Sequence, residues 1–467
     1  MSTKHFLSAK DIVYMNIIGI VSLRQIPNVA PYGASSILLW FIATFCFFIP
    51  LALVCGELST KYSKNGGMFL WIKEAFGLRI AWICTVFYLM SCVLFFPMLL
   101  FFGFSTLTYV LPFNGDCFFL GISKTTFIGI GSMLLFVLLT CLNILGIKWT
   151  KIINSVLIYL GVFLPTIILI VSACVWLLYG DGIQTDYNDV KSYIPDFSNF
   201  NTIVFASSMM FAFAGLELSS MVAGRIQNPQ KDFPRAIFYS AIVIVSIYIV
   251  LTFCINVIYP AKQTSILNGF SQAIEHVWVY FDISFIPIVL EVCIFLAVVG
   301  QVNSWLVGPM YMLKTASKER RILGRSLSKL HPKYKTPYVA LICQAIFVCL
   351  LCMVAIFSSD MEQTYWSFTS LTTLCYFVPY LLVFPSFLKL RKVDMQNQSS
   401  FKVLGKYFPV IISIVGMSSV VFAIFLTLIP PAELKLNDTL DIVKYVFTMF
   451  FGPLISLVIA LLTCKNK

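Results

Sequence analysis

Long apolar runs without charges recur along the chain, and short polar segments separate them. A helix needs roughly 20 apolar residues to cross the hydrocarbon core of a bilayer, and each run reaches about that length. We therefore predict an all-α integral membrane protein with twelve transmembrane helices. The predicted spans are residues 11–32, 34–57, 79–111, 124–146, 150–179, 200–224, 235–259, 284–316, 337–358, 363–388, 407–430 and 442–463.

Residues 25–56 carry no charge, so a turn must divide the first two spans. Pro31-Tyr32-Gly33 supplies one, since Pro and Gly favour turns. Two further segments are too short or too polar to cross a membrane. We expect an amphipathic helix on the outer surface within residues 262–282, and an interfacial piece on the inner side at residues 66–71.

The positive charges divide the polar segments into two classes. Nearly all of the 32 Lys and Arg residues lie between the apolar runs, and they concentrate in alternate gaps. Cytoplasmic loops hold the excess of Lys and Arg in membrane proteins. We therefore predict a multi-pass protein of the cytoplasmic (inner) membrane, with both termini and the 317–336 loop on the cytoplasmic side. The acidic gap at 181–196 then faces outward.

Composition narrows the class of protein further. The chain is 59% hydrophobic and 11% charged, with a mean hydropathy of +0.91, which suits a bilayer and not a soluble domain. Its net charge of +12 could attract nucleic acid, but the positives sit in short loops beside apolar spans, so we expect no nucleic-acid partner. The polar start of the chain predicts no cleavable signal peptide.

Neither the cysteines nor the histidines of the sequence indicate a metal or redox site. The 14 Cys residues lie mostly within apolar runs and act there as small hydrophobic residues, including the C-x-x-C of Cys349 and Cys352. All three His residues lie outside the predicted spans, which excludes an intramembrane histidine relay. The sequence has no nucleophile motif or phosphate loop, so we expect no cofactor, no metal and no enzyme activity.

Two of the apolar runs carry residues that interrupt a helix. Gly19 weakens the first span, Pro27 removes a backbone donor from it, and Gly215 lies at the middle of the sixth. Because these spans are five apart, they cross the membrane in opposite directions, as in a five-plus-five inverted repeat with broken helices 1 and 6. The predicted repeats are residues 11–179 and 200–388; helices 11 and 12 (407–463) complete a single transmembrane domain over residues 1–467.

An unwound stretch in a membrane exposes backbone groups, so it persists only where it lines a cavity. Free N–H groups at the start of a half-helix attract a carboxylate, and free carbonyls at the end of one attract an ammonium group. We predict that the two breaks bind an amino-acid zwitterion; alternatively, the glycines only allow close helix packing. The predicted backbone contacts are Gly19, Ile20, Val21, Ser22, Phe213, Ala214, Gly215 and Leu216.

Arg24, Glu217 and Glu291 are charged residues inside predicted spans. A charge at the bilayer centre costs at least ~2.5–3.5 kcal/mol, so it faces a cavity or a partner. Arg24 either clamps an anionic group of the substrate with its planar guanidinium or pairs with one of the two glutamates. Glu217 either binds the substrate or a proton, or has a structural role in its helix. Glu291 lies near the outer end of its span, where we expect a gate or a structural pair.

Three motifs carry a family resemblance: FAGLELS at residues 213–219, NPQKDFP at 228–234 and NSWLVGP at 303–309. Together with Pro27 and Ala30, they resemble the amino acid–polyamine–organocation superfamily, and within it the bacterial glutamate/GABA antiporter-like exchangers. The resemblance covers the chain to about residue 463. It implies two broken helices around a central substrate, and transport by alternating access, often as exchange of amino acids. By family position, the side chains expected to line the site are Tyr88, Phe213 and Tyr376.

The chain departs from those exchangers at several positions. Gln301, a further candidate for substrate binding, stands where they have an acidic residue, and Arg24 stands where they have an aromatic one. Asn154 and Ser155 replace a Lys that some proton-coupled relatives carry. The chain ends at Lys467, so we expect no C-terminal plug. Proton-coupled symport and a transporter-like membrane sensor stay open as alternatives to exchange, as do the substrate and the oligomeric state.

Overall fold

A computed structural model of the chain describes residues 7–111, 113–114, 117–118, 121–187, 189–196, 208–264, 269–320, 326–357, 361–393, 401–430 and 439–463. Its helices are α1 (Ala9–Ile20), α2 (Gln25–Val29), α3 (Ser35–Ala43), α4 (Ile49–Lys61), α5 (Met68–Phe76), α6 (Leu78–Val110), α7 (Lys124–Ile144), α8 (Ile147–Ile158), α9 (Leu164–Tyr179), α11 (Leu218–Met221), α12 (Pro229–Ile258), α13 (Gly269–Tyr280), α14 (Phe285–Arg320), α15 (Tyr338–Phe357), α16 (Met361–Val393), α17 (Phe408–Thr427) and α18 (Thr439–Thr463).

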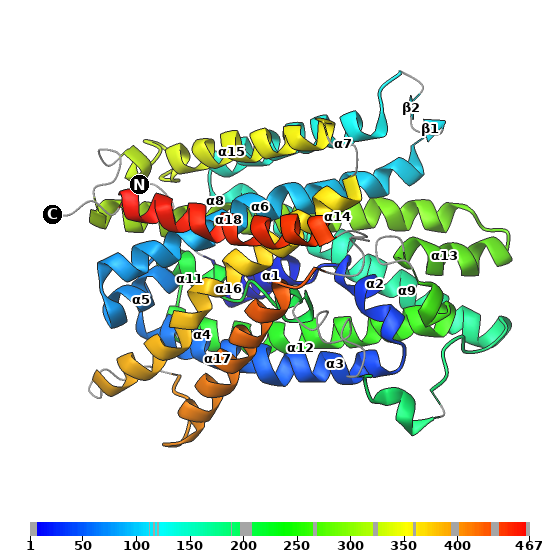
Figure 1. The fold of residues 1–467 in the computed structure, drawn as a ribbon, viewed down its shortest axis with the longest axis horizontal. Coiled ribbons are helices and arrows are strands. Elements are labelled where there is room, and N and C mark those ends of the chain that lie inside the picture. Colours follow the sequence, from blue (N-terminus) through cyan, green and yellow to red (C-terminus); the bar gives the residue numbers. More distant parts are fainter. Residues whose placement is uncertain are drawn as a thin grey trace.

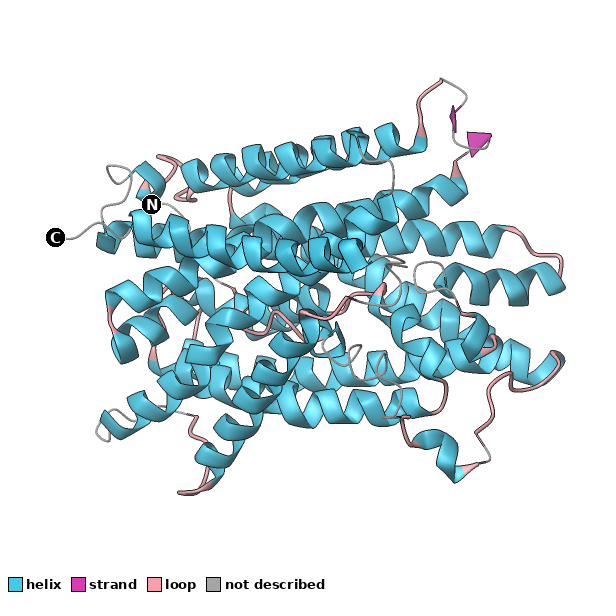
Figure 2. Cartoon of the chain, in the orientation of Figure 1, coloured by secondary structure: helices cyan, strands magenta, loops and turns pink. Residues whose placement is uncertain are grey.

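Helices dominate the described chain, and the only strands within it form a small antiparallel hairpin of β1 (Phe113–Asn114) and β2 (Cys117–Phe118) (Figure 2). Two long helical segments contain a π-helical turn. Thr44–Phe48 joins α3 to α4, and Tyr159–Phe163 joins α8 to α9. The prediction of an all-α protein is therefore confirmed, apart from this hairpin.

Nine helical segments of the described chain are long and apolar enough to cross a membrane, and the bent pair of α1 and α2 makes a tenth. Two predicted spans are not among them. Predicted span 337–358 forms α15, an apolar helix of 20 residues that is counted only over its stretch Tyr338–Met353. Predicted span 200–224 begins outside the described residues. The total of twelve spans therefore remains a prediction.

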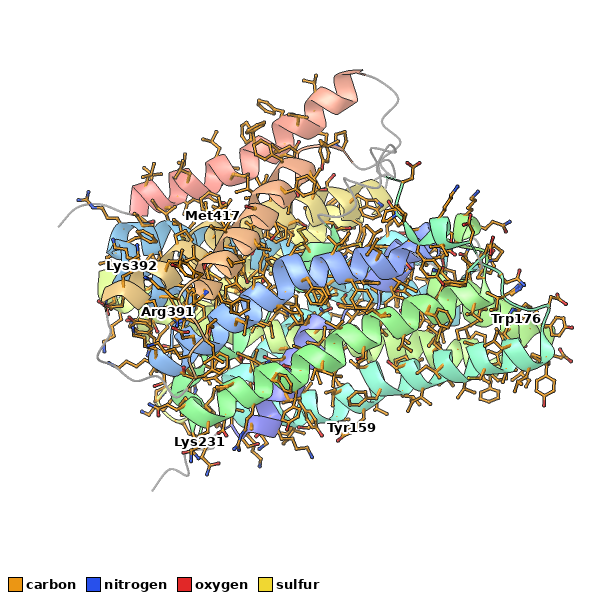
Figure 3. The ribbon with its side chains drawn as sticks, turned by 90° about the horizontal axis from the view of Figure 1, so that it is seen from below. Tyr159, Trp176, Lys231, Arg391, Lys392 and Met417 are labelled. Carbon is orange, nitrogen blue, oxygen red and sulfur yellow. The ribbon has the colours of Figure 1, made fainter. Side chains whose placement is uncertain are left out.

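The long helices lie roughly side by side, so the bundle has two ends (Figure 1). The end of α18 and the short helix α5 lie at one end, and α13 and the β1–β2 hairpin lie at the other. Figure 3 shows Lys231, Arg391 and Lys392 at the first of these ends and Trp176 at the other. We call the end marked by these three residues the basic end.

Several helix starts differ from the predicted boundaries by one to six residues, and two of them have a local cause in the sequence. α12 begins at Pro229 and not at 235, because Pro is favoured in the first turn of a helix, where its missing N–H is not needed. The helix therefore carries Lys231 and Arg235 in its first turns. α8 begins at Ile147 and not at 150, directly after Gly146, whose φ of +123° suits glycine.

Both predicted surface segments contain a short helix. α13 lies within residues 262–282, of which 265–268 are outside the described chain, and α5 overlaps residues 66–71. α13 packs against α9, α12 and α14, and α5 packs against α6 and α16. Each is therefore docked on the long helices.

The chain is interrupted at two places within the bundle. α1 ends at Ile20 and α2 begins at Gln25, and the two axes differ in direction by 53°. Residues 208–212 are helical, residues 213–217 form a turn, and α11 follows. Gly215 in this turn has a φ of +123°, a conformation that residues with a side chain rarely adopt.

α1 occupies the interior of the bundle. It packs against α8, α11, α12 and α14, and nearly all residues of its second half are buried. α6 lies between α14 and α16, and α7 pairs with α15 on the periphery. The interrupted segments are therefore enclosed by long continuous helices, which supply the side chains around them.

Candidate functional site

A single tyrosine hydroxyl joins the two interruptions. Tyr248 of α12 is fully buried, and its hydroxyl lies 2.8 Å from the Ile20 carbonyl oxygen and 2.9 Å from that of Ala212, so its one proton is shared between them. The Ser22 N–H donates to the same hydroxyl at 3.1 Å. The predicted backbone contacts at Ile20 and Ser22 thus lie beside the end of the helix that precedes Gly215.

The carbonyl group of Gly19, next to the end of α1, has two partners on α14. The Gly19 carbonyl accepts a hydrogen bond from Trp305 Nε1 at 2.8 Å and from Gln301 Nε2 at 3.0 Å. These bonds satisfy a carbonyl that the end of the helix leaves without a partner. Gln301 therefore reaches the first break, and its role in substrate binding stays a prediction.

A cluster of hydroxyl groups surrounds Glu217 at the second break. The Tyr88 hydroxyl donates to Glu217 Oε1 at 2.6 Å, and the Tyr376 hydroxyl donates to the same oxygen at 2.9 Å. The Gly215 N–H donates to the Tyr376 oxygen at 3.0 Å, and Tyr380 contacts that hydroxyl as well. Glu217 is fully buried, and its other oxygen has no hydrogen-bond partner among the described residues.

Aromatic rings fill the space beside this cluster. Phe213 stacks on Phe48, with ring centroids 4.5 Å apart, and meets the edges of Trp40 and Tyr248 at 5.5 Å. Trp40 in turn stacks on Tyr248 at 4.5 Å. The rings of α3, the π-turn and α12 thereby hold the first residue of the 213–217 turn in place.

The two glycines of the breaks have different surroundings. A Cβ atom on Gly215 would lie 3.1 Å from Ile20 Cγ1 and 3.2 Å from the Trp305 ring. A Cβ atom on Gly19 would lie 3.4 Å from Leu218 and 3.5 Å from Ser304, which are ordinary contacts. Close packing therefore requires glycine at 215 more strictly than at 19.

Arg24 lies in the short stretch between α1 and α2 and is 2% exposed. Its Nη1 donates to the Tyr365 hydroxyl at 2.9 Å, and its guanidinium carbon lies 6.0 Å from the centre of that ring. No ion pair joins Arg24 to Glu217 or Glu291, all three being described residues. In this conformation the predicted pairing with a glutamate is not formed.

Glu291 lies apart from the two breaks. It sits near the start of α14, is 3% exposed, and accepts a hydrogen bond from Ser271 of α13. α13 is at the end of the bundle opposite the basic end (Figure 1). The structure thus separates Glu291 from the two breaks; its role as a gate or structural charge stays a prediction.

A buried amide network runs beside the site on α7, α8 and α14. Asn303 donates to Asn154 at 2.6 Å, Asn143 donates to Asn303 at 2.8 Å, and Asn154 donates to Ser304 at 2.9 Å. Asn154, which the family resemblance led us to expect in place of a Lys, is thus bonded to two residues of α14. No group of three or more His, Cys, Asp or Glu side chains in the described chain could hold a metal ion.

Most predicted site residues converge, but three important ones were not predicted. Trp305 appeared only within a motif, and Tyr248 and Tyr365 lie in apolar segments whose pattern gives them no special signal. Of the predicted residues, Val21, Ala214 and Leu216 are buried next to the breaks. Their neighbours along the chain make the contacts described above.

Comparison with known proteins identifies the family to which the chain belongs. A family model described as amino acid permease matches residues 6–451 of the chain. The chain belongs to the amino acid permease family. The resemblance seen in its motifs is thereby confirmed, and the family is made up of transporters. The protein is accordingly a multi-pass membrane protein and a secondary amino-acid transporter.

Three relatives show the range of the family. An uncharacterized transporter of Legionella pneumophila is 28% identical over 93% of this chain and 92% of its own length. A glutamate/gamma-aminobutyrate antiporter of Lactococcus lactis is 26% identical over 90% of this chain and 83% of its own. A serine/threonine exchanger of Bacillus subtilis is 24% identical over 88% of each chain. The similarity therefore extends through nearly the whole bundle.

Proposed function

We propose that the protein exchanges one amino acid for another across the cytoplasmic membrane by alternating access. The observation that carries this proposal is the meeting of two interrupted segments at one buried hydroxyl, that of Tyr248. Irregular backbone at membrane depth is tolerated where it is enclosed by protein and lines a ligand site. The names of two relatives, an antiporter and an exchanger, favour exchange.

The proposal includes a topology of twelve spans. Residues 11–179 and 200–388 form two inverted repeats of five spans each, and residues 407–463 add helices 11 and 12. The 53° bend between α1 and α2 and the turn at 213–217 support paired breaks at matching places. The excess of Lys and Arg supports a cytoplasmic position for the basic end and both termini.

In this proposal the substrate binds the backbone of the two breaks. The Ser22 and Gly215 N–H groups now donate to the hydroxyls of Tyr248 and Tyr376. An α-carboxylate that enters replaces these hydroxyls as acceptor, so each N–H group exchanges one hydrogen bond for a charge-assisted one. The carbonyls of Gly19 and Ile20, now bonded to α14 and α12 side chains, face the α-amino group.

Arg24 then selects a substrate with an additional acceptor on its side chain. It is buried beside the first break, and its planar guanidinium can bind a carboxylate through two hydrogen bonds. Glutamate has such a side-chain carboxylate, and one relative is named for its exchange. We therefore rank acidic amino acids and their amides first among candidate substrates.

Proton-coupled symport is the second candidate function. It rests on the buried carboxyl group of Glu217, of which one oxygen is bonded to two tyrosines and the other has no partner among the described residues. Buried carboxyl groups within membrane segments form proton relays in many transporters, so Glu217 could carry a proton that accompanies the substrate.

Counterflow with purified protein in liposomes tests the proposal. Vesicles preloaded with one unlabelled amino acid are diluted into a panel of labelled ones. Exchange predicts accumulation of label only when a substrate is present inside, and no response to an imposed pH gradient. Uptake into empty vesicles that follows the pH gradient would favour symport. Absence of uptake under both conditions, with the whole panel, would contradict transport of amino acids.

A further inference from the structure

An apolar groove of about 520 Å³ lies on the outside of the bundle between α4 and α12. Phe48, Ala52 and Gly56 form one wall, and Phe238, Ala241 and Val245 form the other. Phe238 and the neighbouring Ile242 are 62% and 52% exposed, so the groove opens toward the surroundings of the bundle and not toward the site.

The groove has the length of one membrane leaflet. Its first wall extends from Thr44 to Gly56 and its second from Pro234 to Ser246. At 1.5 Å per residue, either wall is roughly 18 Å long. Half of the hydrocarbon core of a bilayer is about 15 Å thick. An acyl chain that enters from the basic end can therefore lie along the whole groove.

Positive side chains stand at the basic end of the groove. Lys231 and Arg235 are exposed. Lys231 lies three residues before the lining residue Pro234, and Arg235 three before Phe238, so both lie on the groove face of α12. Asp232, the acidic residue in this first turn, accepts a hydrogen bond from the Asn228 N–H. Within the described part of the chain neither Lys231 nor Arg235 forms an ion pair, so both can meet an anion at the membrane surface.

The segment before α17 closes the same end of the groove. Phe401 lines the groove and lies against Gly56. Glu57 fixes this segment, because it accepts hydrogen bonds from the Val403 N–H at 2.7 Å and from Arg391 at 3.2 Å. The next residue after Phe401 is the exposed Lys402, which adds a third positive charge.

We propose that this groove binds an anionic phospholipid of the leaflet at the basic end. One acyl chain lies between α4 and α12, and the headgroup phosphate contacts Lys231 and Arg235. Basic pockets between membrane helices bind acidic headgroups in this way, and each Lys or Arg near an anionic surface adds to the attraction. The position of this leaflet in the cell rests on the proposed topology.

The groove is connected to the proposed transport site through one side chain, that of Phe48. Phe48 lines the groove and stacks on Phe213, the first residue of the turn that carries Gly215 and Glu217. It belongs to the π-helical turn Thr44–Phe48, a type of distortion frequent at functional sites. An acyl chain that fills the groove packs against Phe48 and restricts its movement. Because Phe48 stacks on Phe213, the 213–217 turn is restricted as well. We infer that anionic lipid raises the transport rate.

Photolabelling of purified protein in phosphatidylcholine nanodiscs tests the binding site. The probe is a phosphatidylglycerol analogue with a diazirine near the end of one acyl chain, compared with the same phosphatidylcholine analogue. We expect adducts in peptides containing residues 44–56 and 234–246. The double variant Lys231→Gln, Arg235→Gln should lower labelling by the anionic probe about thirtyfold, with little effect on the neutral one. Lys329→Gln, an exposed lysine elsewhere, is the charge control.

A groove-filling change provides a second test. Ala241→Trp should abolish labelling by the anionic probe, whereas Leu134→Trp on the exposed face of α7 should not. Thermal unfolding confirms that each variant is folded. Equal labelling of wild type and both groove variants, or adducts spread over all outer helices, would overturn the site.

Transport is measured separately. Counterflow in phosphatidylcholine liposomes should accelerate when phosphatidylglycerol is added, and this response should be lost in the Lys231→Gln, Arg235→Gln variant. A rate independent of phosphatidylglycerol would overturn the link through Phe48. Labelling needs no amino acid, so its outcome is independent of whether the proposed exchange activity is correct.

Discussion

At the scale of single residues, side-chain hydroxyl groups provide the hydrogen-bond partners that the backbone loses where a helix is broken. The carbonyl and N–H groups freed near Ile20, Ser22 and Ala212 all meet Tyr248. In a membrane interior no water replaces such a partner. The loss of one oxygen atom should therefore affect both breaks together.

We predict that Tyr248→Phe lowers the counterflow rate at least tenfold and reduces stability by about 1–3 kcal/mol, because it leaves buried backbone groups without partners. Tyr445→Phe is the matched control, since the buried Tyr445 donates one hydrogen bond, to the Thr427 carbonyl between α18 and α17. The control should lose some stability but keep its counterflow rate. Similar loss of transport in both variants would argue against a special role for Tyr248.

Arg24 supports a second prediction. If it binds a side-chain acceptor of the substrate, Arg24→Gln should weaken binding of acidic amino acids about tenfold to a hundredfold, and of apolar ones much less. Inhibition of counterflow by a panel of unlabelled amino acids measures this. Tyr365→Phe, which removes one hydrogen bond of Arg24, should have a smaller effect.

The structural alternative for Arg24 has its own signature. If Arg24 neutralises Glu217, the single variant Arg24→Gln should have a low folded yield. The double variant Arg24→Gln, Glu217→Gln should then recover that yield. The structure places no ion pair between them, so we expect no recovery. Recovery with an unchanged substrate panel would make Arg24 a structural partner in another conformation.

At the scale of elements, the two breaks are built differently. The first is a bend between helices, and Gly19 belongs to the helix before it. The second is a turn in which Gly215 adopts a φ of +123° and lies close to Ile20 and Trp305. The two glycines therefore have different roles, Gly19 within a helix and Gly215 in a turn. Substitution of each should have a different effect.

We predict that Gly215→Ala abolishes counterflow, because its conformation costs an alanine about 1–3 kcal/mol and the added methyl group is crowded. Gly19→Ala meets only ordinary contacts and should retain substantial activity. Gly182→Ala controls for conformation alone, since Gly182 has a φ of +83° and a Cβ atom added there would meet no atom within 4 Å. Full activity of the Gly215 variant at normal abundance would refute the proposed role of this turn.

At the scale of the whole molecule, charge separates the two ends of the bundle. Lys231, Arg391 and Lys392 lie at one end, and Trp176, near the acidic segment at 181–196, lies at the other (Figure 3). The membrane orientation follows from this asymmetry if the positive end is cytoplasmic.

Cysteine labelling of intact cells measures this orientation. On a cysteine-free background, Asp186→Cys should react with an impermeant maleimide added outside, and Lys329→Cys should react only after the cells are opened. Both positions are exposed, so accessibility to solvent is matched. The opposite pattern would invert the topology and place the proposed lipid in the other leaflet.

Local sequence was sufficient for those features that depend on neighbouring residues. Apolar length predicted most helices, because a crossing segment must satisfy its backbone by itself. Pro31-Tyr32-Gly33 predicted the turn that the structure places there, and Gly215 predicted the interruption at 213–217. Ordered motifs identified the family before any contact was known. The pairing of Arg24, in contrast, could not be predicted.

Tertiary structure decided which side chains become hydrogen-bond partners and which face of each helix is buried. Tyr365 meets Arg24 across 341 residues, and Tyr248 meets Ile20 across 228, so no spacing reveals either pair. In a membrane protein both the lipid-facing and the buried sides of a helix are apolar, and periodicity therefore loses the contrast that marks a core. For this reason the run that forms α12 predicted a span, while only packing showed that one face holds the breaks together and another lines a groove.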